Sequence, residues 1–107
     1  MPLQTAVLQG GVALTTASTT IYTVPTGKSA WVKRAVFTNT TGATIAIAIA
    51  ISRAGGAGLA IISSQALTAG SAYVSPELSG LAMNAGDAIL ASATAIGINA
   101  FVSGLTT

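Results

Sequence analysis

The sequence predicts an all-β protein, a single β-sandwich of about seven or eight strands with a jelly-roll or immunoglobulin-like topology. Three observations favour this class. Turn-forming Gly, Pro, Asn and Asp recur roughly every eight to twelve residues, the spacing typical of sandwiches and barrels. No stretch has a convincing helical period. Alanine is abundant, but it is interspersed with Ile, Val, Ser and Thr, which favour a pleated surface over a helix.

The chain of 107 residues has the length of one domain. We divide it into an N-terminal arm or first strand at 1–18 and a sandwich domain at 19–107. Within the first part, Leu3 to Leu14 is interrupted by Gly10-Gly11. As an arm, this segment would add a strand to a neighbouring subunit through its backbone groups. Deleting residues 2–14 is then expected to abolish assembly while the sandwich stays folded.

The next two strands are predicted at 19–24 and 29–39, separated by the turn residues Pro25 to Gly27. In the second of these strands, Ala30 and Val32 share one face, whereas Ala35 and Phe37 have the opposite parity. A bulge at 33–34 would place all four apolar side chains on the core face and turn the two intervening charges outward.

Residues 44–52 form the clearest alternating segment, with Ile at every odd position and Ala at the even positions between them. The Ile face is predicted to be core. An ordinary solvated sheet would carry Thr, Lys or Glu on its other face. Alanine there indicates a surface that is covered by another layer, another subunit or a larger assembly, because the exposed segment would be a cross-β hazard.

The rest of the chain predicts further short strands. We expect a strand at 59–67, a turn-rich stretch at 70–80 and a strong turn at 84–87. The segments 88–93 and 96–102 are predicted to form a closing pair that resembles a hairpin.

The composition argues against catalysis. Only 6% of the residues are charged, against about 25% in ordinary soluble domains, and the chain has no His and no Cys. Glu77 and Asp87 are the only carboxylates, and no other residue type in the chain would orient them or tune their pKa values. We interpret both as turn and solubility residues, in preference to a cation site. The chain is therefore expected to be no enzyme and to need no metal or cofactor.

Nucleic acid and membrane partners are also not expected. The four basic residues are too few to neutralise several phosphates, and the adjacent pair Lys33-Arg34 is interpreted as a solvated charge pair. The longest apolar run, at 45–51, is far shorter than the roughly 20 residues of a spanning helix. The first residues also lack the basic region of a secretory signal, so we expect a soluble chain.

Surface contacts are predicted where apolar side chains face outward. Trp31 has the parity opposite to Ala30 and Val32, which makes it an outward contact residue. The candidate interface residues are Leu3, Val7 and Leu8 of the arm, Trp31, and Ala46, Ala48 and Ala50. These contacts predict a homo-oligomer, most simply a trimer.

Several segments together resemble a recurrent pattern of small structural proteins of tailed bacteriophages. They are Ile21-Tyr22-Thr23-Val24-Pro25-Thr26-Gly27-Lys28, the Asn39-Thr40 turn, Leu81 with Ala85-Gly86-Asp87, and Val102-Ser103-Gly104. The resemblance covers roughly residues 19–104. It implies a non-enzymatic β-sandwich of the virion, made in the host bacterial cytoplasm, and it supplies no catalytic residues.

Within the virion, the preferred role is a head decoration or cement protein that packs against the major capsid protein or other virion proteins. The alternative role is a neck or tail-fibre component that contributes to host attachment through aromatic residues such as Trp31 and Tyr73. The low charge and the Ile/Ala strand depart from typical members of this pattern.

Overall fold

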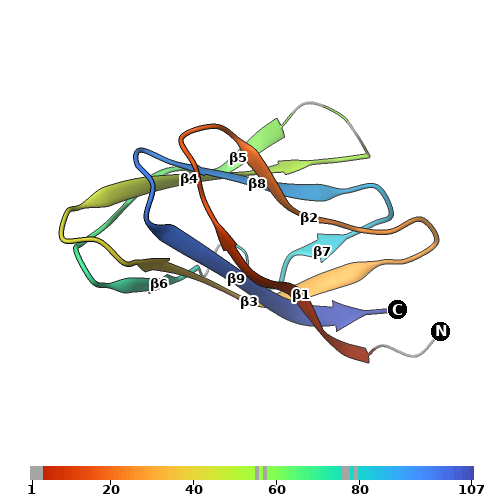
Figure 1. Cartoon of the computed structure of the whole chain (residues 1–107). Coiled ribbons are helices and arrows are strands. Elements are labelled where there is room, and N and C mark those ends of the chain that lie inside the picture. Colours follow the sequence, from red (N-terminus) through yellow and green to blue (C-terminus); the bar gives the residue numbers. More distant parts are fainter. Residues whose placement is uncertain (1–3, 55, 57, 76–77, 79) are drawn as a thin grey trace.

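A computed structural model describes residues 4–54, 56, 58–75, 78 and 80–107. It confirms an all-β fold in which two antiparallel sheets pack face to face as a β-sandwich (Figure 1). The described residues contain no helix, so the high alanine content does not lead to helical structure. The reason is the order of the residues, because alanine alternates with β-branched neighbours.

Each sheet contains strands from distant parts of the sequence. The first sheet has the order β1 (Gln4–Ala13), β9 (Ile98–Thr106), β3 (Ala30–Asn39) and β6 (Ala72–Val74), and the short β7 (Ala82–Met83) also pairs with β3. The second sheet has the order β2 (Thr19–Thr23), β8 (Ala88–Ala93), β4 (Ile45–Ser52) and β5 (Gly58–Leu67). The N-terminal segment is thus an edge strand of the first sheet.

The predicted closing pair at 88–93 and 96–102 is wrong. The two segments form strands, but β8 lies in the second sheet between β2 and β4, whereas β9 lies in the first sheet between β1 and β3. The connection passes from one sheet to the other at Gly97, which has a φ of +120°. A side chain at Gly97 would collide with the Thr41 methyl group. The stretch at 70–80, predicted only as turns, also contains β6.

The bulge predicted in the third strand is confirmed. The pairing of β3 with β9 shifts between Val32, opposite Gly104, and Arg34, opposite Ser103. Lys33 is the extra residue, so the apolar positions before the bulge (30 and 32) and after it (35 and 37) face the same side of the sheet. As a result, Ala30, Val32, Ala35 and Phe37 are all buried, and Lys33 and Arg34 are both exposed.

The core lies between the two sheets and is built mainly from β4, β8, β3 and β9. The four odd-numbered isoleucines of β4 are buried, as the alternation predicts. They meet Phe37, Ile98 and Val102 among the buried residues contributed by the first sheet. Leu14, which follows β1, is also fully buried.

One end of the sandwich is closed by a buried side chain, Asn39, which is 1% exposed. Its Nδ2 donates hydrogen bonds to the carbonyl oxygens of Ala43 at 2.7 Å, Leu67 at 3.0 Å and Thr68 at 3.3 Å. Its Oδ1 accepts hydrogen bonds from the backbone N–H and the hydroxyl of Thr41, at 2.9 and 2.7 Å. One amide therefore ties the turn after β3 to the turn after β5.

Candidate interaction surfaces

The outer surface of the second sheet is an uncharged face of small side chains, which we call the alanine face. Its strands β2, β4, β5 and β8 contain no Asp, Glu, Lys or Arg. The alanine face comprises Ala46, Ala48 and Ala50 of β4, Ala60, Ser63, Ser64 and Ala66 of β5, and Leu90 and Ser92 of β8.

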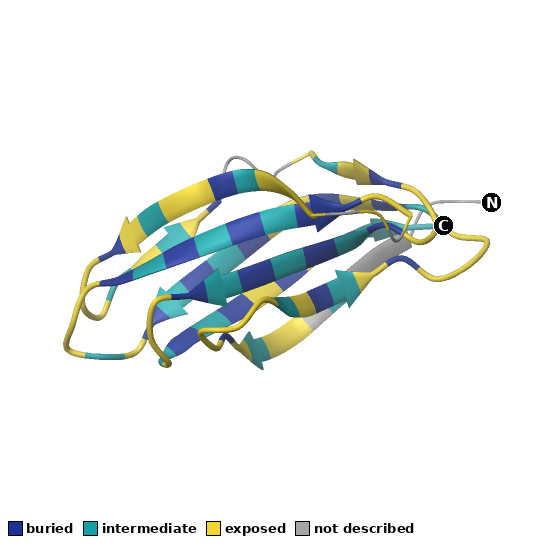
Figure 2. Ribbon diagram, turned by 90° about the horizontal axis from the view of Figure 1, so that it is seen from above, coloured by how far each residue is buried: buried dark blue, intermediate teal, exposed yellow. Residues whose placement is uncertain are grey.

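Burial along the two central strands of this sheet alternates, except at the end of β4, where Ile51 and Ser52 are both buried. Figure 2 shows β4 and β8 as a sequence of buried and half-buried positions. The half-buried positions of β4 are Ala46, Ala48 and Ala50, which lie on the outer surface as predicted. Because their neighbours across the strands are again Ala, Ser or Leu, the face offers few polar groups to water.

Two shallow hollows lie side by side on the alanine face. The larger has a volume of about 260 Å³ and lies between Ala50, Ala60 and Leu90. The smaller, of about 110 Å³, lies between Ala46, Ser64 and Thr94. Ala48 lines both hollows and therefore marks the centre of the face.

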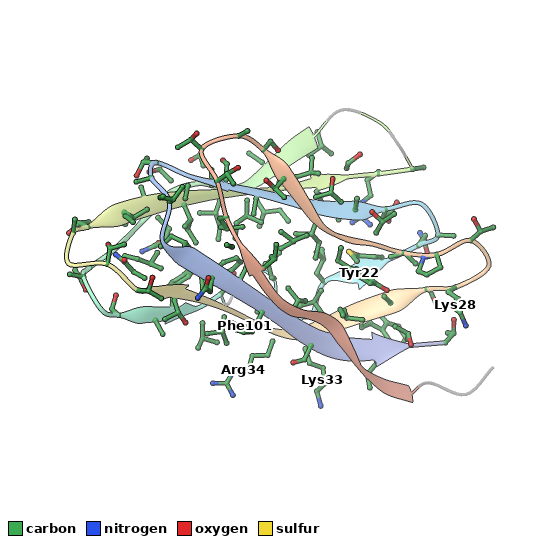
Figure 3. All side chains as sticks on the ribbon, viewed as in Figure 1. Tyr22, Lys28, Lys33, Arg34 and Phe101 are labelled. Atoms are coloured by element: carbon green, nitrogen blue, oxygen red, sulfur yellow. The ribbon has the colours of Figure 1, made fainter. Side chains whose placement is uncertain are left out.

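The outer surface of the first sheet has a different chemistry. Trp31 is 42% exposed and Phe101 is 41% exposed, so the outward position predicted for Trp31 is confirmed. Lys33 and Arg34 point away from the sandwich on the same side (Figure 3). Tyr73 lies in β6 opposite Phe37 and is half-buried against the core. The host-attachment alternative treats Tyr73 as a contact residue, but Tyr73 lies within a strand and is partly covered by the core.

The carboxylate of Asp87 is buried and serves the fold. The residue is 3% exposed, and its carboxylate oxygens accept hydrogen bonds from the backbone N–H groups of Asn84 at 2.9 Å and Ala54 at 3.0 Å. The Arg53 guanidinium lies 2.7 Å from Oδ2 and also donates to the Ala82 carbonyl. The N–H of Asn84 and the bond from Arg53 hold the pKa of Asp87 below its usual range.

Asp87 thus joins two turns. The turn between β7 and β8 lies at the end of the sandwich opposite to the turn between β3 and β4 (Figure 1). The sequence placed Asp87 in a turn but did not reveal Arg53 as its partner. The two residues are 34 positions apart, and only the folded chain brings them together. Glu77 lies outside the described residues.

The outcome differs among the three predicted contact residues of the arm. Leu3 lies outside the described residues, and Val7 lies in β1 opposite Ser103. Leu8 is half-buried and packs against the core. Because β1 pairs with β9 and leads into the buried Leu14, deletion of residues 2–14 would remove part of the sandwich. The expectation that such a deletion leaves the sandwich folded is therefore withdrawn.

Among the described residues, no group of three or more Asp or Glu side chains is placed to hold a metal ion. The described part of the chain also has no helix that is long and apolar enough to cross a membrane. Comparisons with protein-family models, curated proteins and solved structures find no match to this chain.

Proposed function

We propose that this chain is a non-enzymatic structural protein of a tailed-phage virion, and most specifically a decoration or cement protein of the capsid. The sequence resemblance described above supports the virion assignment. The mode of action would be burial of surface against several partners, so that many weak contacts add to the stability of the lattice.

The observation that carries this proposal is the alanine face. A monomer that stays in solution normally carries mixed charges on its outer strands. Here all four strands of one sheet lack charge, and the centre of the outer face is formed by Ala48 and its small neighbours. Such an uncharged surface of small side chains suits close packing against another protein.

We further propose that the sandwich is a jelly roll. When the two-residue β7 is left aside, eight strands divide equally between the sheets. The chain changes sheet at almost every connection, and β4 to β5 is the main exception. This arrangement fits two Greek keys wound together, an architecture that occurs in viral capsid domains and lectins. Fold alone does not establish function, so the role rests on the surface.

The partners in this proposal are further copies of the chain, with a trimer favoured, and the major capsid protein or another virion protein. The site of action is the virion, after synthesis in the host bacterial cytoplasm. The proposal includes no nucleic acid, membrane or cofactor partner.

A particle-binding experiment tests the proposal. The chain is expressed together with the head proteins encoded beside its gene, and its copy number on purified particles is measured. The wild-type chain is expected at hundreds of copies, a rough figure for a symmetric lattice. Ala48→Lys is expected to lose particle binding, because a cation at the centre of the alanine face would be buried without a partner.

The matched control is Ala72→Lys, an equivalent change at an exposed position of β6 on the other sheet. It is expected to leave particle binding unchanged. Normal occupancy by Ala48→Lys, or absence of the wild-type chain from the particles, would overturn the assignment.

The neck or tail-fibre role remains the second candidate, favoured by the exposed aromatic side chains of Trp31 and Phe101. This role predicts roughly six to twelve copies per particle. It also predicts that Trp31→Ala weakens attachment to host cells while the stability of the virion is unchanged.

A further inference from the structure

The outer face of the first sheet has features that the alanine face does not explain. In a regular strand, successive side chains point to opposite faces. The bulge in β3 instead turns Lys33 and Arg34 to the same outer surface. Figure 3 shows both side chains extending away from the sandwich. Bulges often serve to aim a side chain, so this pair of cations is a specific product of the fold.

The two cations lie between two apolar pairs of the ladder formed by β3 and β9. Trp31 is opposite Leu105 on one side, and Val36 is opposite Phe101 on the other. Ser103 lies between them, opposite Arg34. Two residues of a strand span about 7 Å, so the exposed aromatic residues Trp31 and Phe101 lie within roughly 15 Å of each other, with the cations between them.

The ring of Phe101 is held in place from the side by β1. A Cβ atom added at Gly11 would lie 3.0 Å from Cε1 of Phe101, so the ring lies directly over this glycine. Contact of this kind covers the backbone of a glycine in an edge strand. About two-fifths of Phe101 nevertheless stays exposed, so the ring presents a fixed apolar surface beside Arg34.

The positive charge of Arg34 is not neutralised by the carboxylate that the structure describes. Asp87 is buried at one end of the sandwich, where Arg53 binds it at 2.7 Å. Lys28 lies apart from this group, and its Nζ donates to the carbonyl oxygen of Thr107 at 3.2 Å. Arg34 is thus exposed on a sheet face between two aromatic side chains.

We propose that Trp31, Lys33, Arg34 and Phe101 form a docking surface for an acidic segment of a partner protein. Carboxylates of that segment would pair with Arg34 and Lys33, while its apolar side chains would pack on the two aromatic residues. Arg, Trp and Phe are the side chains enriched at the centres of protein interfaces. The strands β1, β6 and β9 add no further Lys or Arg, so an extended phosphate backbone would find too few cations.

This docking surface lies on the first sheet, whereas the alanine face lies on the second sheet. Binding of an acidic segment to it therefore does not depend on the function of the alanine face. The molecule would then hold two different neighbours, one against uncharged small side chains and one against carboxylates. The acidic partner is recognised by charge complementarity, which chiefly governs specificity and the rate of association.

Trp31 provides a direct measurement, because it is the only tryptophan of the chain. Poly-L-glutamate is added at pH 7 and low salt, and Trp emission is recorded. We expect a saturable change in emission that weakens as sodium chloride is added. Arg34→Gln is expected to weaken binding about fivefold, which is the effect of losing one partly exposed ion pair. Lys33→Gln is expected to have a similar effect.

Lys28→Gln is the matched control, because it removes a cation outside the proposed surface, and its affinity should equal that of the wild-type chain. Urea midpoints of all variants show whether they remain folded. Absence of an emission change, an equal loss in Lys28→Gln, or unaltered affinity in both Arg34→Gln and Lys33→Gln would each contradict the proposal. Tighter binding of single-stranded oligo-dT than of poly-L-glutamate would also overturn it and would indicate a nucleic acid surface.

Discussion

At the scale of single residues, buried polar groups hold the turns at both ends of the sandwich. Asn39 and Asp87 are each almost fully buried, and each bonds to the backbone of two separate segments. An unsatisfied buried polar group costs about 1 to 3 kcal/mol, so these side chains fix the conformation of the loops around them. Ala54, with a φ of +50°, is held in this way by its bond to Asp87.

Asp87→Asn is expected to lower the free energy of unfolding at pH 7 by about 2 to 4 kcal/mol. The substitution removes the negative charge that pairs with Arg53. It also replaces a carboxylate oxygen that accepts a backbone N–H by an amide NH2 group, which cannot accept that hydrogen bond. In the wild-type chain, the pKa of Asp87 is lowered from 3.8, so its stabilisation is present above about pH 4 and is lost as pH falls through the folded-state pKa.

Urea unfolding at a series of pH values measures this effect. The stability difference between the wild-type chain and Asp87→Asn should be largest near neutral pH and should shrink below about pH 4. Other acidic groups are shared by both proteins, so the difference isolates Asp87. A difference that stays constant down to pH 2 would contradict this account of its carboxylate.

Gly104→Ala is expected to destabilise the fold by about 3 kcal/mol. Gly104 faces the bulge in β3, and a Cβ atom there would collide with the carbonyl oxygen of Trp31. Gly42→Ala is the control, because a Cβ atom added at Gly42 meets nothing within 4 Å. Thermal or urea unfolding of the two variants gives the comparison. Similar stabilities would show that the backbone at Gly104 relaxes readily.

At the scale of elements, the bulge in β3 decides which side chains reach the core. Removing its extra residue restores a regular strand in which Val32 and Ala35 still face inward. Deletion of Lys33 is therefore expected to leave a cooperatively folded protein, at a cost of about 1 to 2 kcal/mol. Deletion of Val36 shifts every later side chain to the opposite face, including Phe37, and is expected to prevent folding.

Near-ultraviolet circular dichroism and urea unfolding distinguish the two deletions. Retention of a cooperative transition by the Lys33 deletion and its loss in the Val36 deletion would agree with the register described for β3. Equal damage from both deletions would contradict it.

The sequence allows the faces of individual strands to be predicted better than their partners. The Ile positions of β4 and the bulge at Lys33 follow from parity alone, because side chains alternate with a period of two. Pairing of β8 with β2 and β4 involves residues far apart in the chain, and the local pattern carries no information about it. The contact of Asn39 with Leu67 and those of Arg53 with Ala82 and Asp87 were missed for the same reason, since these partners are 28 to 34 residues away.

The predicted contact surface was identified in part. Ala46, Ala48 and Ala50 lie outward as their parity indicates, but Ala60 and Leu90 of the same surface come from neighbouring strands. A list drawn from one strand cannot include them, because sheet order determines which outward residues are adjacent. Phe101 was not among the predicted contact residues, because its position opposite Val36 depends on the register of β9.

At the scale of the whole molecule, the two sheets present opposite surfaces of different character. The alanine face is expected to drive self-association of the purified chain, and a trimer is the simplest product. Sedimentation velocity over a range of concentrations should show assemblies for the wild-type chain and for Ala72→Lys, whereas Ala48→Lys should remain monomeric. A monomeric wild-type chain at all concentrations would contradict self-association through this face.

The central position of β4 also has a consequence for the order of events during synthesis. β5 follows it directly and can pair with one edge at once, but 35 residues lie between the end of β4 and the start of β8. At roughly 5 to 20 residues per second, the ribosome needs roughly 2 to 7 s to make that stretch. During this interval the other edge of an uncharged Ile/Ala strand is open to pairing with another nascent chain. The yield of folded protein is therefore expected to depend on how quickly the ribosome synthesises the second half of the chain.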